Sequence, residues 1–413
     1  MTQKQIAIIG GGIVGILTAL DLQKRNCQVT LLDPKEPGSE TSYGNSGVLS
    51  EASVVISNNP NLTKRLPQLI KGKSNALTVR FGFVIKNLPW IIRFLSHCTD
   101  QHLELSSQAL RNLQKTSLKI HKELIKEAGA NNLLRETGWL KIFRSEKSFA
   151  AYNMELNVLK RRGVNYIVFN SEELRQIEPS LKPIFYKGVL LQDTCSVSSP
   201  FELCKNYVRL FKIAGGKVVQ NAVTKIKRPN QWNITLKNNK NLEADEVVIA
   251  AGPWSAEIAG SLGYRIPMAW ERGYHLHLEP GPGINRPIHD VDAGYVMSPQ
   301  LQGVRITSGV ELADREAPKS FLQIFRAVAS AKEAVKLGKT IEDTPWMGRR
   351  PTLIDSLPMI GKAPKHNNLW FNFGHQHNGL STSAGSAKIL TALLHHETPP
   401  IDPNPFRPTR FRL

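Results

Sequence analysis

The first fifteen residues constrain the fold of this chain more than any other segment. The apolar run Ile6-Ala7-Ile8-Ile9 leads directly into the pattern Gly10-x-Gly12-x-x-Gly15, and apolar residues at helical spacing follow. In such a unit the first glycine makes a tight turn, the second lets the backbone approach a pyrophosphate, and the third lets the helix pack closely on the strand. The helix N-terminus offers free N–H groups to phosphates. The segment predicts a strand–turn–helix unit that binds a dinucleotide.

A second apolar strand supports this interpretation. Val29-Thr30-Leu31-Leu32 ends on Asp33, about 20 residues beyond the glycines, where a carboxylate can accept hydrogen bonds from ribose hydroxyls. Because strand, glycines, helix, second strand and acid occur in this order, we favour a dinucleotide site over a chance glycine-rich turn.

Length and composition bound the overall organisation. The chain has 413 residues, which favours two domains that share one cofactor. Its net charge of +19 predicts an anionic surface or ligand, such as lipid headgroups, nucleic acid or acidic metabolites. The four cysteines form no C-x-x-C pair, which suits a reducing compartment.

The first residues already form the cofactor strand, so we expect no signal peptide. The longest apolar run, 81–98, contains Lys86, Pro89 and Arg93, so we expect no transmembrane span. The predicted location is cytoplasmic, with peripheral contact on the inner face of the cell membrane as an option. That option rests on the block 52–99, which lacks acids, carries seven Lys or Arg residues, and has apolar side chains at 88–95. The alternative is a solvated helical face.

Hydrophobic periodicity predicts an α/β (α+β) protein. We expect helices over 62–128, 149–162, 202–214, 319–337 and 381–396, and strands over 138–143, 164–169, 217–219, 223–226, 232–236 and 244–251. Residues 265–310 alternate as in an antiparallel sheet. The prediction is a discontinuous Rossmann-like nucleotide-binding domain over 1–60, 185–264 and 345–413, and an antiparallel-sheet substrate domain over 61–184 and 265–344.

Six motifs occur in order along nearly the whole chain, and together they resemble the FAD-dependent D-amino-acid oxidase superfamily. Within it, the chain is most similar to the D-amino-acid dehydrogenase and hydroxyproline dehydrogenase branch. The motifs are the N-terminal glycine unit with Asp33, the loop 40–47 (ETSYGNSG), 248–255 (VIAAGPWS), 271–275 (ERGYH), 348–361 (GRRPTLIDSLPMIG), and Gly374-His375 with Gly379-Leu380-Ser381. Two departures are Ser46, where relatives have alanine, and the doubled arginine Arg349-Arg350.

The resemblance implies non-covalently bound FAD. The positions that match cofactor-binding residues of the family are Gly10, Gly12, Ile13, Val14, Gly15, Asp33, Thr41, Ser42, Asn45, Ser46, Gly47, Val223, Ala251, Gly252, Trp254, Gly379, Leu380 and Ser381. The N-terminus of the last helix would stabilise negative charge on the reduced flavin ring.

The resemblance also implies an α-amino or imino acid substrate that loses a hydride to flavin N5. Arg350, directly before Pro351, is the candidate for the substrate carboxylate, because a guanidinium binds a carboxylate through two parallel hydrogen bonds. Tyr274 and His375 are the other candidate catalytic residues. Arg349 fits a surface position better, and Arg272 either binds carboxylate or pairs with Glu271.

Several kinds of site are not expected. The reaction needs no general base or nucleophile, because the neutral amine supplies the electrons as the hydride leaves. The histidine pairs at 275/277, 375/377 and 395/396 invite a metal-site interpretation, but none has acids or thiols at ligand spacing, so no metal is predicted.

The leading hypothesis is FAD-dependent oxidative deamination of D-amino acids or oxidation of proline-like imino acids. Electrons would pass to a quinone, the respiratory chain or another acceptor that is not NAD. The alternatives are a tRNA-modifying flavoenzyme of the same superfamily, a glycine/sarcosine-type oxidase, and a non-catalytic flavin-binding protein. Nucleic acid is not an expected partner, because no RNA-binding module accompanies the positive charge.

Overall fold

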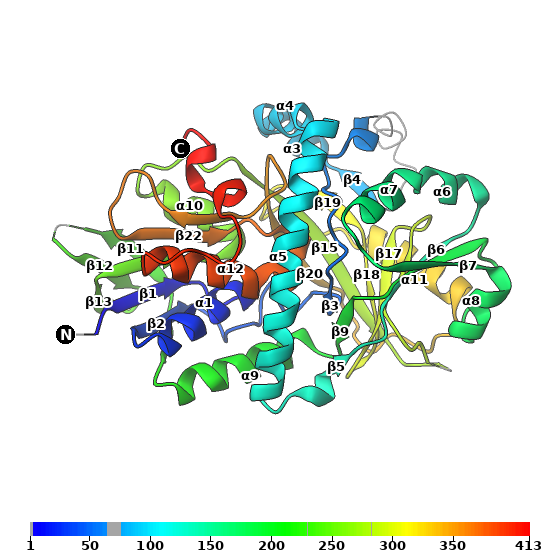
Figure 1. Cartoon of the computed structure of the whole chain (residues 1–413), viewed down its shortest axis with the longest axis horizontal. Coiled ribbons are helices and arrows are strands. Elements are labelled where there is room, and N and C mark those ends of the chain that lie inside the picture. The colour runs from blue at the N-terminus through cyan, green and yellow to red at the C-terminus, as the bar shows by residue number, and fades with distance from the viewer. Residues whose placement is uncertain (1–2, 64–75, 229, 282) are drawn as a thin grey trace.

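The computed structural model describes residues 3–63, 76–228, 230–281 and 283–413. Two large sheets lie side by side along the long axis of the molecule, and the helix α5 (Asp100–Glu127) crosses between them (Figure 1). The N-terminus lies at the end of the molecule that carries the first sheet. Four residues of the basic block, Lys64, Arg65, Lys71 and Lys73, lie outside the described residues, as does part of the predicted helical region 62–128.

The first sheet is the predicted dinucleotide-binding core. Its described strands follow the order β10-β2-β1-β14-β22-β21, and all neighbours are parallel except β22 and β21. The helices α1 (Ile13–Lys24) and α12 (Gly379–Leu394) pack beside this sheet (Figure 1). The strands are β1 (Gln5–Ile9), β2 (Gln28–Asp33), β10 (Lys217–Gln220), β14 (Glu246–Ile249), β21 (Met359–Lys362) and β22 (Leu369–Phe373).

The second sheet is mainly antiparallel, as the alternation over 265–310 predicts. Its described strands follow the order β4-β19-β15-β18-β17-β16-β6-β8-β7, with β20 paired to β15; only β4–β19 and β6–β16 are parallel. The helix α11 (Leu322–Ala334) packs on it. The strands are β4 (Leu77–Val79), β6 (Trp139–Phe143), β7 (Tyr166–Asn170), β8 (Lys187–Leu191), β15 (Met268–Leu278), β16 (Ile288–Asp290), β17 (Tyr295–Gln300), β18 (Gly303–Thr307), β19 (Val310–Leu312) and β20 (Trp346–Leu353).

Smaller elements complete the fold. One small sheet is formed by β11 (Val223–Lys227), β12 (Trp232–Leu236) and β13 (Asn241–Ala244), and another by β3 (Val48–Leu49), β5 (Leu134–Arg135) and β9 (Cys195–Val197). The remaining labelled α-helices are α3 (Phe81–Lys86), α4 (Leu88–Ser96), α6 (Glu146–Ala151), α7 (Asn153–Arg161), α8 (Ser171–Ile177), α9 (Pro200–Ile213) and α10 (Ser255–Gly260). Two short 3-10 helices, η2 (Gly252–Trp254) and η3 (Gln376–Asn378), lie beside the site described below.

Three elements fall on the other side of the domain boundaries predicted above. The strands β8 and β20 lie in ranges assigned to the nucleotide-binding domain, yet they pair within the second sheet. The helix α5 lies in a range assigned to the substrate domain, yet it packs on α12 of the first. A Cβ added at Gly385 of α12 would lie 2.8 Å from the carbonyl oxygen of Leu113. Sequence order does not reveal such pairings, because they are set by the register of distant strands.

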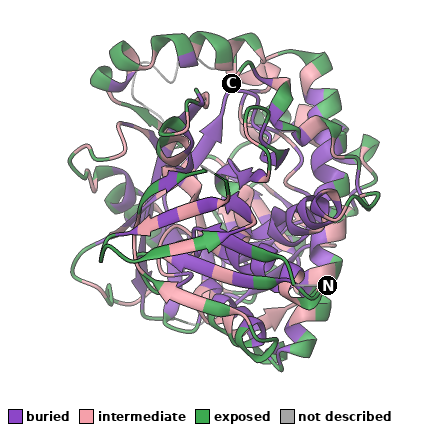
Figure 2. Ribbon diagram, turned by 90° about the vertical axis from the view of Figure 1, so that its left-hand side faces the viewer, coloured by how far each residue is buried: buried purple, intermediate pink, exposed green. Residues whose placement is uncertain are grey.

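Helix α5 is tied to its neighbours by a buried histidine. Nδ1 of His121 lies 2.9 Å from the Tyr207 hydroxyl of α9, and Nε2 lies 2.9 Å from the carbonyl oxygen of Leu380. The buried residues of α1, α5 and the central strands form one continuous core, seen in purple in Figure 2. His121 is fully buried on α5 between Leu118 and Ile125 of this core. Burial lowers the pKa of His121 from 6.5 to about 4, so this ring is neutral in the folded protein near pH 7.

This histidine predicts acid sensitivity. Between pH 6.5 and about 4 the unfolded chain binds the proton that folded His121 excludes, so the free energy of unfolding falls as the pH drops through this window. Across this pH window, the protonation of His121 accounts for a loss of about 3 kcal/mol in the free energy of unfolding. Urea unfolding of the His121→Gln variant at pH 7.5 and pH 5 should show a smaller loss of stability between the two pH values than the parent shows. An equal loss in both proteins contradicts the assignment.

Candidate active site

A cavity of about 390 Å³ lies where the two sheets meet. Its walls come from segments far apart in the sequence: the loop 41–46, the strands β6, β15, β16 and β20, and the segment 376–381 that opens α12. Ten of the predicted site residues line it, namely Ile13, Thr41, Ser42, Asn45, Ser46, Tyr274, Arg350, Gly379, Leu380 and Ser381.

The N-terminal turn has the close contacts that its glycines predict. Gly10 has a φ of +115°, and a Cβ there would lie 2.4 Å from the carbonyl oxygen of Ala250. A Cβ at Gly15 would lie 1.9 Å from the carbonyl oxygen of Gly10, so only glycine allows α1 to approach β1 this closely. The backbone N–H of Ile13 donates to the Ser42 hydroxyl at 2.9 Å, which links the helix start to the loop 41–46.

Asp33 ends β2 beside this turn. Its carboxylate accepts hydrogen bonds from the backbone N–H groups of Gly11, at 2.7 Å, and Lys35, at 2.8 Å. Burial raises its pKa, while these two hydrogen bonds act to lower it. A carboxylate has about four acceptor positions, so capacity remains for ribose hydroxyls.

The loop 41–46 is held from both sides. The Thr41 hydroxyl donates to the carbonyl oxygen of Arg349 at 2.8 Å. The guanidinium of Arg305, on β18, donates to the carbonyl oxygens of Tyr43 and Asn45 at 2.7 and 2.6 Å. Arg305 is buried, which lowers its pKa to about 10, and its Nε donates to His277 at 3.0 Å. Our sequence analysis did not identify Arg305, because nothing in the sequence near residue 305 points to a loop 260 residues away.

Arg350 lies in the cavity wall on β20. Its register partner on β15 is Glu271, and its guanidinium covers the bare backbone of Gly273, where a Cβ would lie 2.3 Å from Nη2. Burial lowers the pKa of Arg350, and the nearby Glu271 carboxylate partly opposes this effect. Among the described residues, Arg350 has no hydrogen-bond or ion-pair partner within bonding distance. The cavity therefore contains a guanidinium whose donors are available.

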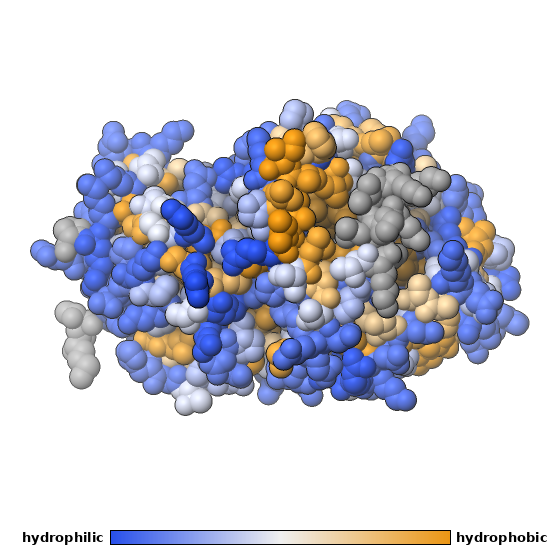
Figure 3. All heavy atoms as spheres, turned by 90° about the horizontal axis from the view of Figure 1, so that it is seen from above, coloured by the Kyte–Doolittle hydropathy of each residue, from blue (hydrophilic) through white to orange (hydrophobic). Residues whose placement is uncertain are grey.

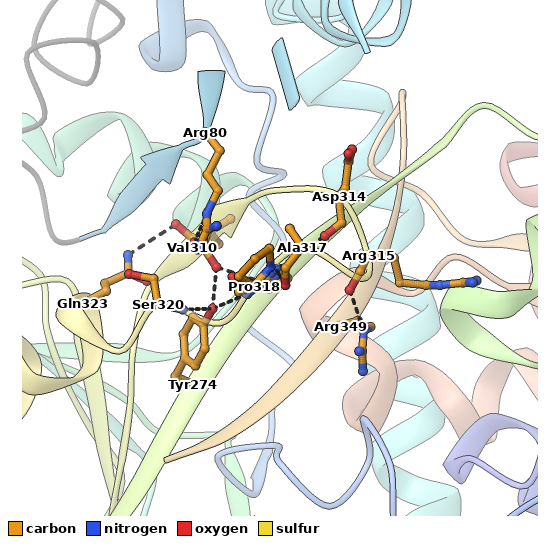
Figure 4. Close-up of polar contacts among 12 residues, drawn as sticks. Arg80, Tyr274, Val310, Asp314, Arg315, Ala317, Pro318, Ser320, Gln323 and Arg349 are labelled. Carbon is orange, nitrogen blue, oxygen red and sulfur yellow. Dashed lines mark hydrogen bonds and ion pairs between the residues drawn. The ribbon is translucent and has the colours of Figure 1, made fainter. Parts of the chain in front are cut away.

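The neighbouring arginines are occupied elsewhere. Arg349 pairs with Glu316 at 2.9 Å. Its guanidinium also donates to the carbonyl oxygen of Arg315, as Figure 4 shows. Arg272 is fully buried, pairs with Glu311 at 3.1 Å, and donates to the carbonyl oxygens of Ala317 and Pro318. Arg272 therefore pairs with Glu311 and not with Glu271, and it is not among the residues that line the cavity.

Tyr274 borders the cavity, but its hydroxyl is committed to the same network (Figure 4). It donates to Glu311 at 2.5 Å and accepts hydrogen bonds from Arg272, at 2.7 Å, and from the backbone N–H of Ser320. Burial raises its pKa, and the bond to Glu311 raises it further. The structure therefore does not bring the Tyr274 hydroxyl to Arg350, and the substrate contact expected from it lacks geometric support.

The start of α12 faces the cavity. Asn378, its N-cap, makes no side-chain capping bond, and Gly379, Leu380 and Ser381 form the first turn. His375 precedes this helix but does not line the cavity. Burial lowers its pKa to about 3, and its Nε2 has no hydrogen-bond partner among the described residues.

The other predicted cofactor residues lie outside this cavity. Gly10, Gly12, Val14, Gly15 and Asp33 form the N-terminal turn and the helix behind it, and Gly47 closes the loop. Ala251 sits against Gly10, Gly252 begins η2, and the ring of Trp254 lies 5.9 Å from the guanidinium of Arg349. Val223 begins β11, three residues after Gln220, the register partner of Asp33. These residues follow the edge of the first sheet away from the cavity.

One wall of the cavity was not foreseen. Trp139 and Lys141 on β6 and His289 on β16 share one face of the second sheet, since Lys141 and His289 are register partners and Trp139 is two residues from Lys141. Glu155 and Tyr152 face them from α7 and the turn before it. The signal in the sequence was the alternation of these polar residues with buried Leu140 and Ile142.

The residues present fit FAD. The glycine turn and the N-terminus of α1 suit a pyrophosphate. Asp33 ends the adjacent strand, and the loop 41–46 and the start of α12 border a cavity beyond it. When bound, FAD supplies a hydride acceptor. The described residues contain no group of three His, Cys, Asp or Glu side chains that could hold a metal ion.

Comparison with known proteins agrees with this chemistry. The family model described as "DAO: FAD dependent oxidoreductase" matches residues 5–393. The chain belongs to this family. It is 32% identical to a D-amino-acid oxidase of Bradyrhizobium diazoefficiens, over 99% of both chains. It is 27% identical to D-amino acid dehydrogenase 1 of Mesorhizobium japonicum, over 98% of this chain and 99% of the relative.

Solved structures share the fold. A glycine oxidase from Geobacillus kaustophilus aligns with a TM-score of 0.75 at 19% identity, over 99% of this chain and 100% of its own. An L-proline dehydrogenase from P. horikoshii aligns with a TM-score of 0.76 at 16% identity, over 99% and 98%. The resemblance, the mixed fold and FAD as the cofactor are confirmed, and the protein is an FAD-dependent oxidoreductase.

The contact between Gly273 and Arg350 yields a prediction. A methyl group at Gly273 would overlap the guanidinium, so the Gly273→Ala variant should displace Arg350 and lower kcat/KM by about 100-fold, with FAD content unchanged. Gly260→Ala is the control, because a Cβ there meets nothing within 4 Å. Flavin absorbance and steady-state kinetics are the measurements. Normal kinetics in Gly273→Ala would show that the position of Arg350 does not matter.

Proposed function

We propose that this protein oxidises an α-amino or imino acid, with the substrate carboxylate held by Arg350. The observation that carries the proposal is the guanidinium of Arg350 in the cavity wall, without a close ionic partner, while its two neighbouring arginines are consumed by other contacts. Burying an unpaired guanidinium is costly, and an anionic ligand removes that cost. A bidentate bond to carboxylate would also fix the α-carbon for hydride transfer.

The cavity needs no protein base for this chemistry. The substrate loses a hydride from its α-carbon and a proton from its amine, and the resulting imine is hydrolysed or stays cyclic. Burial, together with the charges of Arg350 and Lys141, lowers the pKa of His377 to about 4, so this ring in the cavity wall stays neutral at working pH. The role of the side chains here is to bind, orient and exclude water.

The relatives support D-amino acids as the substrate class. A curated D-amino-acid oxidase and several D-amino acid dehydrogenases match along almost the full length of the chain. Oxidase and dehydrogenase are names that imply different electron acceptors, so the relatives do not choose one. We propose a quinone or another acceptor of the respiratory chain on the basis of a surface feature of this protein.

That feature is an exposed apolar face on α3 and α4. Four side chains at helical spacing are exposed by about half or more, while Phe83 and Trp90 on the opposite side are buried. Lys86 and Arg93 flank the face, and Figure 3 shows the apolar atoms gathered on this side of the molecule. We call the set the α3–α4 face: Phe81, Ile85, Leu88 and Ile92. Apolar side chains beside cations suit an anionic lipid surface, where quinones reside. No helix of the described ranges is long and apolar enough to cross a membrane.

Removing the guanidinium should weaken substrate binding and leave the cofactor bound. The Arg350→Ala variant should retain its flavin spectrum and lose about 100-fold or more in kcat/KM, since two charge-assisted hydrogen bonds disappear. Arg349→Ala is the matched control and should change turnover little, because Arg349 faces Glu316. The readout is anaerobic flavin bleaching by a panel of D-amino and imino acids. Unchanged bleaching in Arg350→Ala removes Arg350 from the site, and a parent that no amino or imino acid reduces ends the proposal.

Membrane contact has a separate test. The Ile85→Ser/Ile92→Ser double variant should bind phosphatidylglycerol vesicles at least about tenfold more weakly than the parent in a sedimentation assay. Ile213→Ser, which changes a side chain 71% exposed on α9, is the control. Equal binding by all three proteins would contradict a lipid-docking role for the α3–α4 face, and a change from dimer to monomer in the double variant would assign it to self-association.

A further inference from the structure

The cavity has a second polar end besides Arg350. Lys141 projects from β6 with its side chain 12% exposed, and its Nζ lies over the rings of Trp139 and Tyr152, 5.1 and 4.9 Å from their centroids. Its ionic partner is Glu155, with Nζ and Oε2 separated by 3.4 Å. This distance is long for a charge-assisted hydrogen bond, so the ammonium is only loosely paired.

The groups around Lys141 are rich in hydrogen-bond donors. Nε1 of Trp139 has no hydrogen-bond partner among the described residues, and neither has Nδ1 of the adjacent His289. The two rings stack, with centroids 6.1 Å apart. An indole N–H can only donate, so the Trp139 N–H lacks an acceptor unless a ligand brings one.

The surroundings of Lys141 favour its charged ammonium form. Burial acts to lower the pKa of Lys141, but Tyr152 and Glu155 outweigh it and raise the pKa above its usual value. His289 is neutral, because burial and the charge of Lys141 lower its pKa to about 3. His377 lines the same cavity, and the charges of Arg350 and Lys141 both act to lower its pKa. The wall of the cavity therefore carries two cations, Arg350 and Lys141, that can face one ligand.

We propose that Lys141, with Trp139 and His289, forms a subsite for a second carboxylate, so that the preferred substrates are dicarboxylic amino or imino acids. The α-carboxylate would bind Arg350, and the distal carboxylate would bind the Lys141 ammonium and accept from the Trp139 N–H. Glu155 would act as the counter-ion of Lys141 when no acidic ligand is present. This inference rests on the proposed oxidation of amino or imino acids at the same cavity.

Matched substrates test the proposal. D-Glutamate and D-glutamine, like D-aspartate and D-asparagine, have nearly the same shape and differ in the charge of the side chain. The parent should prefer the acid of each pair. In Lys141→Met the acid-to-amide ratio of kcat/KM should fall by about tenfold or more, because a charge-assisted hydrogen bond is lost. In Glu155→Gln the ratio should rise, since a competing carboxylate is removed.

The acid-to-amide ratio of kcat/KM distinguishes loss of carboxylate recognition from general damage to the fold. A merely structural role for Lys141 would lower kcat/KM for both members of a pair equally, and such a result overturns the proposal. Lys160→Met, on the exposed side of α7, is the control and should leave the ratio unchanged. A parent that prefers the amides would also overturn it.

A binding measurement distinguishes this inference from the proposed function. Calorimetric titration of the holoprotein with glutarate and with its half-amide requires no turnover. Glutarate should bind the parent more tightly, and Lys141→Met should remove the difference. If glutarate shows this pattern while no amino acid is oxidised, the subsite stands and the proposed reaction fails. If amino acids are oxidised and glutarate shows no preference, only the subsite is wrong.

Discussion

The site of this protein depends on the pairing of β15 with β20. Eight residues of each strand are in antiparallel register, from Met268 opposite Leu353 to His275 opposite Trp346. This ladder sets Arg350 on the backbone of Gly273 and brings Trp346 against Gly44, where a Cβ would lie 1.8 Å from the indole. Because the chain continues from β20 into β21 and β22 of the first sheet, one strand pair positions both the loop 41–46 and the candidate substrate anchor at the same cavity.

The cations of this region differ in how fully their charges are compensated. Arg272 and Arg305 are buried, and the guanidinium of each donates to two backbone carbonyl oxygens, so each holds a loop in place. Arg350 and Lys141 line the cavity, the first without a close partner and the second with a long ion pair. Buried charges that lack full compensation are expensive, and their cost is removed when an anion binds. The proposed reaction and the proposed subsite both rest on this contrast.

Neutral histidines suit the same cavity. His289 and His377 lie beside cations and are held in the uncharged form by burial. They can donate and accept hydrogen bonds without adding charge that would compete with the two cations for a carboxylate. Burying neutral histidines makes the stability of the fold depend on pH. As the pH falls, the unfolded chain binds protons that buried histidines such as His121 exclude, so the free energy of unfolding decreases.

What the sequence by itself determined was local. The glycine turn, the helix after it, the strand that ends on Asp33 and the arginine before Pro351 follow from residue types at short spacings, and the family resemblance followed from the order of such motifs. The tertiary structure alone decided which side chains meet. It placed Lys141 beside His289, assigned the Tyr274 hydroxyl and Arg272 to Glu311, and paired β8 and β20 with the second sheet. The physical reason is that short-range patterns report backbone conformation and burial, whereas contacts between distant strands depend on a register that no single segment encodes.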